Sequence, residues 1–214
     1  MSERAEVPLD AASLAPGTNL LVAGPAMTGK RQLLYHLLGH SGEADHATSI
    51  VTTRKAADTV EREYRAVDPD VTRLGIVDCV SRQRGFGTVE ESPTRRYVGN
   101  AGDLTGIGIR TSEFMRRFQA DDTVDTASVG LHTSSTVLMY TELRRVFQFY
   151  HVMTGRVESA GYTGVFVIDT PTADNALAVL KQLFDGLVEV RESEDGRQLR
   201  VRGIEAGPRQ WTGF

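Results

Sequence analysis

A glycine-rich loop between an apolar run and an amphipathic stretch constrains this chain more than any other feature of its sequence. Residues Asn19–Ala23 form an apolar run typical of a buried strand, and residues 31–38 place four leucines on one helical face. The segment between them, Gly24-Pro-Ala-Met-Thr-Gly29-Lys30-Arg31, fits the pattern G-x-x-x-x-G-K. Strand, loop, lysine and helix in this order predict a phosphate-binding loop at the start of an α/β domain.

The chemistry of the loop predicts which residues bind the ligand. Glycines let the backbone approach phosphate oxygens closely, and the N–H groups at a helix start supply positive potential. The lysine of such a loop reaches the outer phosphates. We therefore predict nucleotide binding by Gly24, Pro25, Ala26, Met27, Thr28, Gly29, Lys30 and Arg31.

Arg31 departs from the usual end of the motif. That position is ordinarily Ser or Thr, whose hydroxyl ligates Mg²⁺, and a guanidinium has no acceptor for a cation. Two interpretations stay open. Arg31 places a permanent positive charge where the metal would lie, or the loop is a structural remnant and Arg31 is a solvated surface residue.

Apolar runs alternate with amphipathic stretches along the 214 residues, which predicts one α/β domain over residues 1–214 with a mostly parallel sheet flanked by helices. Residues 1–13 are expected to be an N-terminal tail. The segments 186–191 and 197–203 predict an antiparallel hairpin at the C-terminal edge. Further strands are predicted at 19–23, 48–52, 74–78, 127–131 and 164–168, and helices at 31–38, 56–67 (with charged residues 61–63 facing water), 111–119, 134–159 and 173–184.

Residues 80–108 interrupt this alternation, because they are rich in Gly, Arg, Ser and Thr. We expect a long loop or insertion at the edge of the sheet. A solvated loop and a patch that binds phosphate or a partner both remain open interpretations. The arginines concerned are Arg82, Arg84, Arg95 and Arg96.

Composition narrows the classes of partner. A net charge of −4 gives no global basic field, so nucleic acid is not expected as a partner. No apolar run is long enough to span a membrane and no signal-peptide core precedes the domain, so we expect a cytoplasmic protein.

The single Cys79 is expected to be a buried apolar residue. The histidines at 36, 40 and 46 lack cysteine or paired carboxylate neighbours at ligand spacing, so no metal site is expected.

Two segments carry a resemblance to a known family. Leu14-Ala-Pro-Gly-Thr-Asn-Leu-Leu-Val-Ala-Gly24, leading into the loop, resembles the opening of RecA-fold ATPases of the KaiC type. Phe184-Asp-Gly-Leu-Val-Glu-Val190 resembles the closing segment of that family. The chain looks especially like short, divergent KaiC-like proteins of halophilic archaea. The resemblance implies a RecA-like P-loop fold, ATP as the ligand, and a homo-oligomer or other protein partners.

The resemblance also locates departures from the family pattern. His132 stands where the family has the Asp that holds Mg²⁺, so that Asp169 would end the next strand at the position of a polar sensor residue. The alternative makes Asp169 the metal ligand and catalytic residue. Arg54 and Lys55 stand where the family has the acid that polarises the attacking water. His132, Arg54 and Lys55 are therefore expected beside the phosphates.

These departures favour a degenerate KaiC-like nucleotide-binding protein whose ATP hydrolysis is impaired or absent. Such a protein would bind ATP weakly or without Mg²⁺, with cations supplied by the protein, and would act in regulation or signalling through protein contacts. Two alternatives stay open. One is an active Mg²⁺-dependent ATPase that uses Asp169, and the other is a recombinase-related, DNA-associated accessory protein whose arginines between 82 and 96 contact phosphate.

Overall fold

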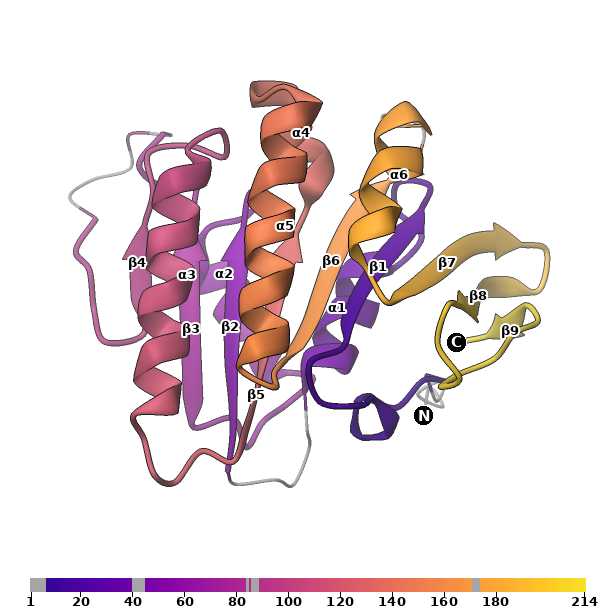
Figure 1. The fold of residues 1–214 in the computed structure, drawn as a ribbon, viewed down its shortest axis with the longest axis horizontal. Helices are drawn as coiled ribbons and strands as arrows, with labels where there is room; N and C mark the ends of the chain where they lie inside the picture. The colour runs from indigo at the N-terminus through magenta and orange to yellow at the C-terminus, as the bar shows by residue number, and fades with distance from the viewer. Residues whose placement is uncertain (1–6, 40–44, 84, 86–88, 171–173) are drawn as a thin grey trace.

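The computed structural model describes residues 7–39, 45–83, 85, 89–170 and 174–214. Within these residues a nine-stranded sheet runs through the molecule in the order β4-β3-β2-β5-β6-β1-β7-β8-β9 (Figure 1). The strands from β4 to β7 are parallel to one another, and β7, β8 and β9 are antiparallel. The strands are β1 (Asn19–Gly24), β2 (His46–Thr52), β3 (Arg73–Asp78), β4 (Arg95–Tyr97), β5 (Thr126–His132), β6 (Thr163–Asp169), β7 (Gly186–Ser193), β8 (Gly196–Arg202) and β9 (Thr212–Gly213).

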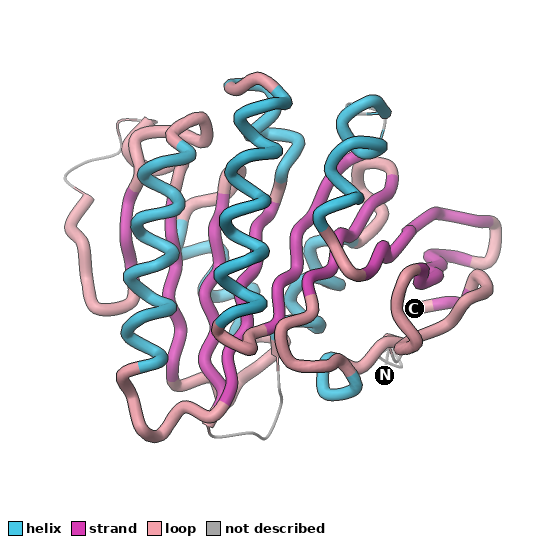
Figure 2. The backbone as a smooth tube through the Cα atoms, in the orientation of Figure 1, coloured by secondary structure: helices cyan, strands magenta, loops and turns pink. Residues whose placement is uncertain are grey.

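Helices cover both faces of the sheet. In Figure 1, α3, α5 and α6 lie in front of the sheet, and α1 and α2 lie behind it. Figure 2 shows the parallel strands ending together along the upper edge of the sheet, where loops lead into the helices. The helices are α1 (Lys30–Leu38), α2 (Ala57–Arg65), α3 (Leu104–Gln119), α4 (Ser134–Tyr140), α5 (Leu143–Ser159) and α6 (Asp174–Leu180), with short 3₁₀ helices at Ala11–Ser13 and Lys181–Leu183.

Alternate side chains of the central strands enter two separate hydrophobic clusters. In β1, Leu21 and Ala23 join the cluster under α3, α5 and α6, while Leu20 and Val22 join the one under α1 and α2. All six residues of β1 are buried, as expected for a parallel strand covered on both faces. The predicted α/β fold with its C-terminal hairpin is confirmed. Cys79 is also buried, as predicted.

Three predicted helices differ from the structure, and two strands, β4 and β9, were not predicted. Helix α3 begins at Leu104, seven residues before the predicted start, because the Asp103 carboxylate accepts a hydrogen bond from the Gly106 N–H at 2.8 Å and caps it. The predicted helix over 134–159 is two helices, since Thr141 and Glu142 have extended backbones. Helix α6 ends at Leu180 and gives way to a 3₁₀ turn before residue 184. Strand β4 lies inside the segment that was expected to be a loop.

Some sequence expectations fall outside the described residues. These are residues 1–6 of the expected N-terminal tail, His40, Arg84 and the predicted helix start at residue 173. In the part of the chain that the structure describes, no helix is both long enough and apolar enough to cross a membrane.

Candidate functional site

The expected site lies where four parallel strands end. Strand β6 stands between β1 and β5, with Asp169 paired to Gly24 in register. His132, at the end of β5, pairs with Thr52 of β2 and is one strand further from the loop. The strand next to the glycine loop is therefore the one that ends in Asp169. This topology brings the Asp169 carboxylate, rather than His132, within reach of the loop lysine.

The glycine loop turns from β1 into α1 through a left-handed residue. Gly29 has φ +81°, a conformation that favours glycine, and a Cβ there would lie 2.8 Å from Arg197 Nη1. Met27 is 91% exposed on the outside of the loop. The first N–H groups of α1 have no carbonyl partners inside the helix, so they give this end of the loop a positive potential.

Lys30 is buried at the end of the loop and contacts a carboxylate. Its side chain is 4% exposed, and Nζ lies 2.9 Å from Asp169 Oδ1. The ammonium group also donates to the carbonyl oxygen of Pro25. Burial lowers the pKa of Lys30, and the hydrogen bond and charge of Asp169 oppose that shift. Arg54 Nη1 lies 3.8 Å from Asp169 Oδ2, so two cations converge on one carboxylate.

His132 sits among these charges as a neutral imidazole. Burial, together with the positive charge of Arg31, lowers its pKa to about 4, and Asp169 only partly opposes the shift. The carbonyl of His132 accepts a hydrogen bond from Thr53 Oγ1 at 3.1 Å, which ties β5 to the end of β2. The structure thus brings His132, Asp169, Arg54 and Lys30 together, with the imidazole uncharged at neutral pH, whereas Lys55 pairs with Glu63.

Arg31 and Lys55 are held by a carboxylate of α2. Arg31 Nε lies 3.1 Å from Glu63 Oε2, and Lys55 Nζ lies 2.5 Å from Glu63 Oε1. Tyr35 donates its hydroxyl to the same carboxylate at 3.4 Å. Sequence reasoning missed Glu63, which it placed among charges facing water. No spacing in the sequence reveals it, because Glu63 meets Arg31 and Lys55 only through the packing of α2 beside α1.

Another carboxylate at the same edge, that of Asp78, accepts hydrogen bonds from backbone N–H groups. Asp78, at the end of β3, is fully buried. Its carboxylate accepts N–H groups of Ala57 at 2.8 Å, Val80 at 2.7 Å and Ser81 at 2.9 Å. These contacts fix the start of α2 and the turn after β3. Asp78 therefore has a structural role.

Two clefts flank the loop. One of about 700 Å³ is lined by Ala26 of the loop, by Arg54 and Asp169, and by Ser135 and Tyr140 of α4. The other, of about 640 Å³, lies on the outer side of α1 and is lined by Arg31, Glu63, Arg197 and Phe214, among others. Ala26 of the loop lines the first cleft, whereas the second begins at Arg31 of α1, so a ligand held by the loop extends most directly into the first.

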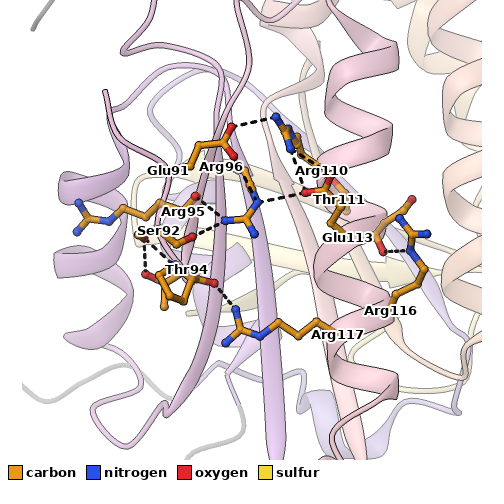
Figure 3. A network of polar contacts seen from close by, with 12 residues as sticks. Glu91, Ser92, Thr94, Arg95, Arg96, Arg110, Thr111, Glu113, Arg116 and Arg117 are labelled. Carbon is orange, nitrogen blue, oxygen red and sulfur yellow. Dashed lines mark hydrogen bonds and ion pairs between the residues drawn. The ribbon is translucent and has the colours of Figure 1, made fainter. Parts of the chain in front are cut away.

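Two residues of the segment 80–108 form ion pairs with α3: Arg96 with Glu113, and Glu91 with Arg110 (Figure 3). Glu91 lies 3.6 Å from Arg82 Nη2 and 3.0 Å from Arg110 Nη2. Arg96 Nε lies 3.1 Å from Glu113 Oε2, and Glu113 also pairs with Arg110. This network fastens the segment around β4 to the side of α3.

Arg95 points the other way, toward α2. Its guanidinium lies 2.6 Å from Asp58 Oδ1 and 2.7 Å from Glu61 Oε2. The described arginines of the segment, Arg82, Arg95 and Arg96, are thus paired with carboxylates rather than gathered into an open phosphate-binding patch.

A family model matches residues 17–190 of the chain, and it describes a family of unknown function, DUF7504. The chain belongs to DUF7504. The match includes the glycine loop, His132 and Asp169, and it ends inside β7, the first strand of the C-terminal hairpin. No curated protein matches the chain.

A solved structure shows where the DUF7504 fold belongs. The chain is similar to the KaiC-like protein PH0186 from the hyperthermophilic archaeon Pyrococcus horikoshii OT3, with a TM-score of 0.61 and 13% identity. The alignment covers 96% of this chain and 88% of that chain. At this identity the likeness establishes the fold, so the predicted KaiC-like RecA fold of this DUF7504 chain is confirmed. The halophilic form of the family stays a prediction.

Proposed function

We propose that this DUF7504 chain binds a nucleoside triphosphate, with ATP as the first candidate, and hydrolyses it slowly or not at all. The observation that carries the proposal is Lys30, a 4% exposed ammonium group at the end of the glycine loop, held 2.9 Å from Asp169. Burial disfavours a charged lysine, so the position requires an anion beside it. A phosphate group can take the place that the carboxylate now holds.

The residues around the loop fit the phosphates of a nucleotide. The loop N–H groups and the start of α1 supply donors, and Lys30 supplies a charge that the phosphates neutralise. Arg54, which is 57% exposed, can turn from Asp169 toward the cleft. Arg31 and Lys55 are held by Glu63, so we assign them to bracing α1 against α2 rather than to the phosphates themselves.

The same residues fit a catalytic Mg²⁺ poorly. A Mg²⁺ ion bound with the nucleotide would supply charge stabilisation for phosphoryl transfer. Arg31 offers it no hydroxyl, and Asp169 is shared between two cations. His132 stands where the family has a metal-binding Asp, and burial and the surrounding positive charge keep its imidazole neutral, so it supplies no negative charge to a metal ion. Binding without efficient turnover suits a regulatory or signalling protein of the cytoplasm that acts through protein partners or a homo-oligomer.

Nucleotide titrations test the proposal directly. A fluorescent ATP analogue is titrated by anisotropy in Mg²⁺ and in EDTA, and phosphate release is followed in parallel. We expect binding in both buffers, and a loss of about tenfold or more in Lys30→Ala because a charge-assisted phosphate contact is removed. Lys181→Ala is the matched control, since that lysine lies in the 3₁₀ turn after α6.

Two results would overturn the proposal. If the wild-type chain binds no nucleotide in either buffer, the loop is a structural remnant. If it shows robust Mg²⁺-dependent turnover that disappears in Lys30→Ala and Asp169→Asn but persists in His132→Ala, the chain is an active ATPase with Asp169 as its catalytic residue.

A further inference from the structure

The outer surface of the molecule has a groove between α3 and α5, which lie side by side in front of the sheet (Figure 1). The groove has two connected hollows of about 680 Å³ and 370 Å³ that share Ile109, Val152 and Arg156 as lining residues. Ile109 is 52% exposed and Val152 is 51% exposed, so each helix contributes a large aliphatic side chain that nothing in the described chain covers.

Small residues leave room between these side chains. Gly108 and Gly155 line the groove, and a Cβ built on Gly155 would meet no atom within 4 Å. Ser112 lies between them, with its hydroxyl accepting a hydrogen bond from Arg156. The groove is therefore open along its floor and apolar at its middle.

Positive charge surrounds this apolar middle. Arg116, Arg145 and Arg156 line the groove, and none of them has a carboxylate partner among the described residues. Glu113, the acid nearest to Arg116 on α3, pairs with Arg96 and Arg110 instead. In a chain with a net charge of −4, this face is thus a local cationic surface.

We propose that the groove docks an acidic amphipathic α-helix of a partner protein. Apolar side chains of that helix would cover Ile109 and Val152, and its carboxylates would pair with the three arginines. The groove follows α5 from Arg145 to Ser159, a rise of about 21 Å, which matches a partner helix of about four turns.

The charge and the aliphatic floor together favour a peptide over nucleic acid. A phosphate backbone could pair with the arginines but offers nothing apolar to Ile109 and Val152. The groove also lies on the helical face, whereas the glycine loop lies at the ends of the strands. The proposal consequently stands or falls separately from nucleotide binding.

A designed peptide tests the docking site on the full chain. The probe is a fluorescein-labelled, four-turn helix with leucines on one face and glutamates on its borders. Its controls are a scrambled peptide of the same composition and the same helix with lysine in place of glutamate. We expect saturable binding of the probe alone, weakened about tenfold or more by Arg116→Glu with Arg156→Glu. Ile109→Ser with Val152→Ser should weaken it as well.

Arg62→Glu is the matched control variant, because Arg62 is exposed on α2 behind the sheet. It should bind the probe as the wild type does. Equal binding of the scrambled peptide, equal loss in Arg62→Glu, or no binding by the wild type would overturn the proposal. So would groove-dependent binding of a duplex DNA probe without the peptide, or self-association in sedimentation that the Ile109→Ser and Val152→Ser changes abolish.

Discussion

At the scale of single residues, burial lowers the pKa of two bases beside the glycine loop, Lys30 and His132, but their charged neighbours differ. Lys30 keeps a carboxylate at 2.9 Å, which opposes the effect of burial on its pKa. His132 has positive neighbours, and burial and charge together bring its pKa to about 4. The charge state at this edge therefore depends on tertiary neighbours, which neither residue type nor spacing along the chain specifies.

The low pKa of His132 predicts a loss of stability in mild acid. The folded state holds the imidazole neutral down to about pH 4, whereas the unfolded chain takes up the proton near pH 6.5. The free energy of unfolding therefore falls as the pH drops from 6.5 toward 4. Between pH 7.5 and pH 5, this group should account for about 2 kcal/mol.

Urea unfolding of His132→Gln at both pH values measures that contribution. The variant should lose about 2 kcal/mol less than the wild type between pH 7.5 and pH 5. His151→Gln, which changes an exposed histidine of α5, is the control and should lose as much as the wild type. Equal losses in all three proteins would show that His132 is not held neutral by the fold.

At the scale of elements, the sequence predicts those strands and helices whose positions depend on a local pattern of apolar and polar residues. Buried parallel strands are apolar runs, and the main strands were located within two residues of their ends. Strand β4 was missed because Arg95-Arg96-Tyr97 is short and charged, as edge strands often are. Helix α3 was predicted too short because Gly106 and Gly108 lower helix propensity in its first turns.

The residues of the candidate site also fall into those that the sequence predicts and those that only the packing of the fold brings in. The glycine loop and Lys30 follow from a local motif, and the resemblance brought Asp169 and His132 to the same edge. Glu63 could not be predicted, because it meets Arg31 and Lys55 only when α2 packs beside α1. Pairings between elements depend on packing angles that no spacing in the sequence encodes.

Two glycines predict opposite effects of the same substitution. Gly130 of β5 lies against α1, where an added Cβ would overlap Leu38 and lie 3.2 Å from Leu34 Cδ1. Gly130→Ala should therefore destabilise the fold by about 1–3 kcal/mol. Gly155 of α5 has open space where an added methyl group would lie, so Gly155→Ala should stabilise the helix by about 0.5–1 kcal/mol.

Chemical denaturation of both variants tests these opposite signs. The midpoint should move down for Gly130→Ala and up for Gly155→Ala, with the slope unchanged. A stable Gly130→Ala protein would mean that α1 is packed less closely on β5 than the structure indicates.

At the scale of the whole molecule, one sheet joins both hydrophobic clusters and the C-terminal hairpin. Strand β7 pairs with β1 in parallel and with β8 in the antiparallel direction. Leu199 and Val201 of β8 belong to the same cluster as Val22 of β1 and Leu33 of α1. The hairpin is therefore part of the core around the glycine loop and should unfold with it.

The single Trp211 provides a probe of that cooperativity. Its ring lies against the guanidinium groups of Arg191 and Arg200, whose Cζ atoms are 4.2 Å and 4.4 Å from the ring centroid. Tryptophan fluorescence thus reports on the hairpin, while far-ultraviolet circular dichroism reports on the helices.

We expect both signals to change at one urea concentration, because a single cooperative unit shows coincident transitions. Leu199→Ala, which should cost about 2–5 kcal/mol, must lower both midpoints together. A fluorescence transition that precedes the loss of helix, or one that Leu199→Ala moves alone, would mean that the hairpin unfolds independently and that the loop keeps its core without it.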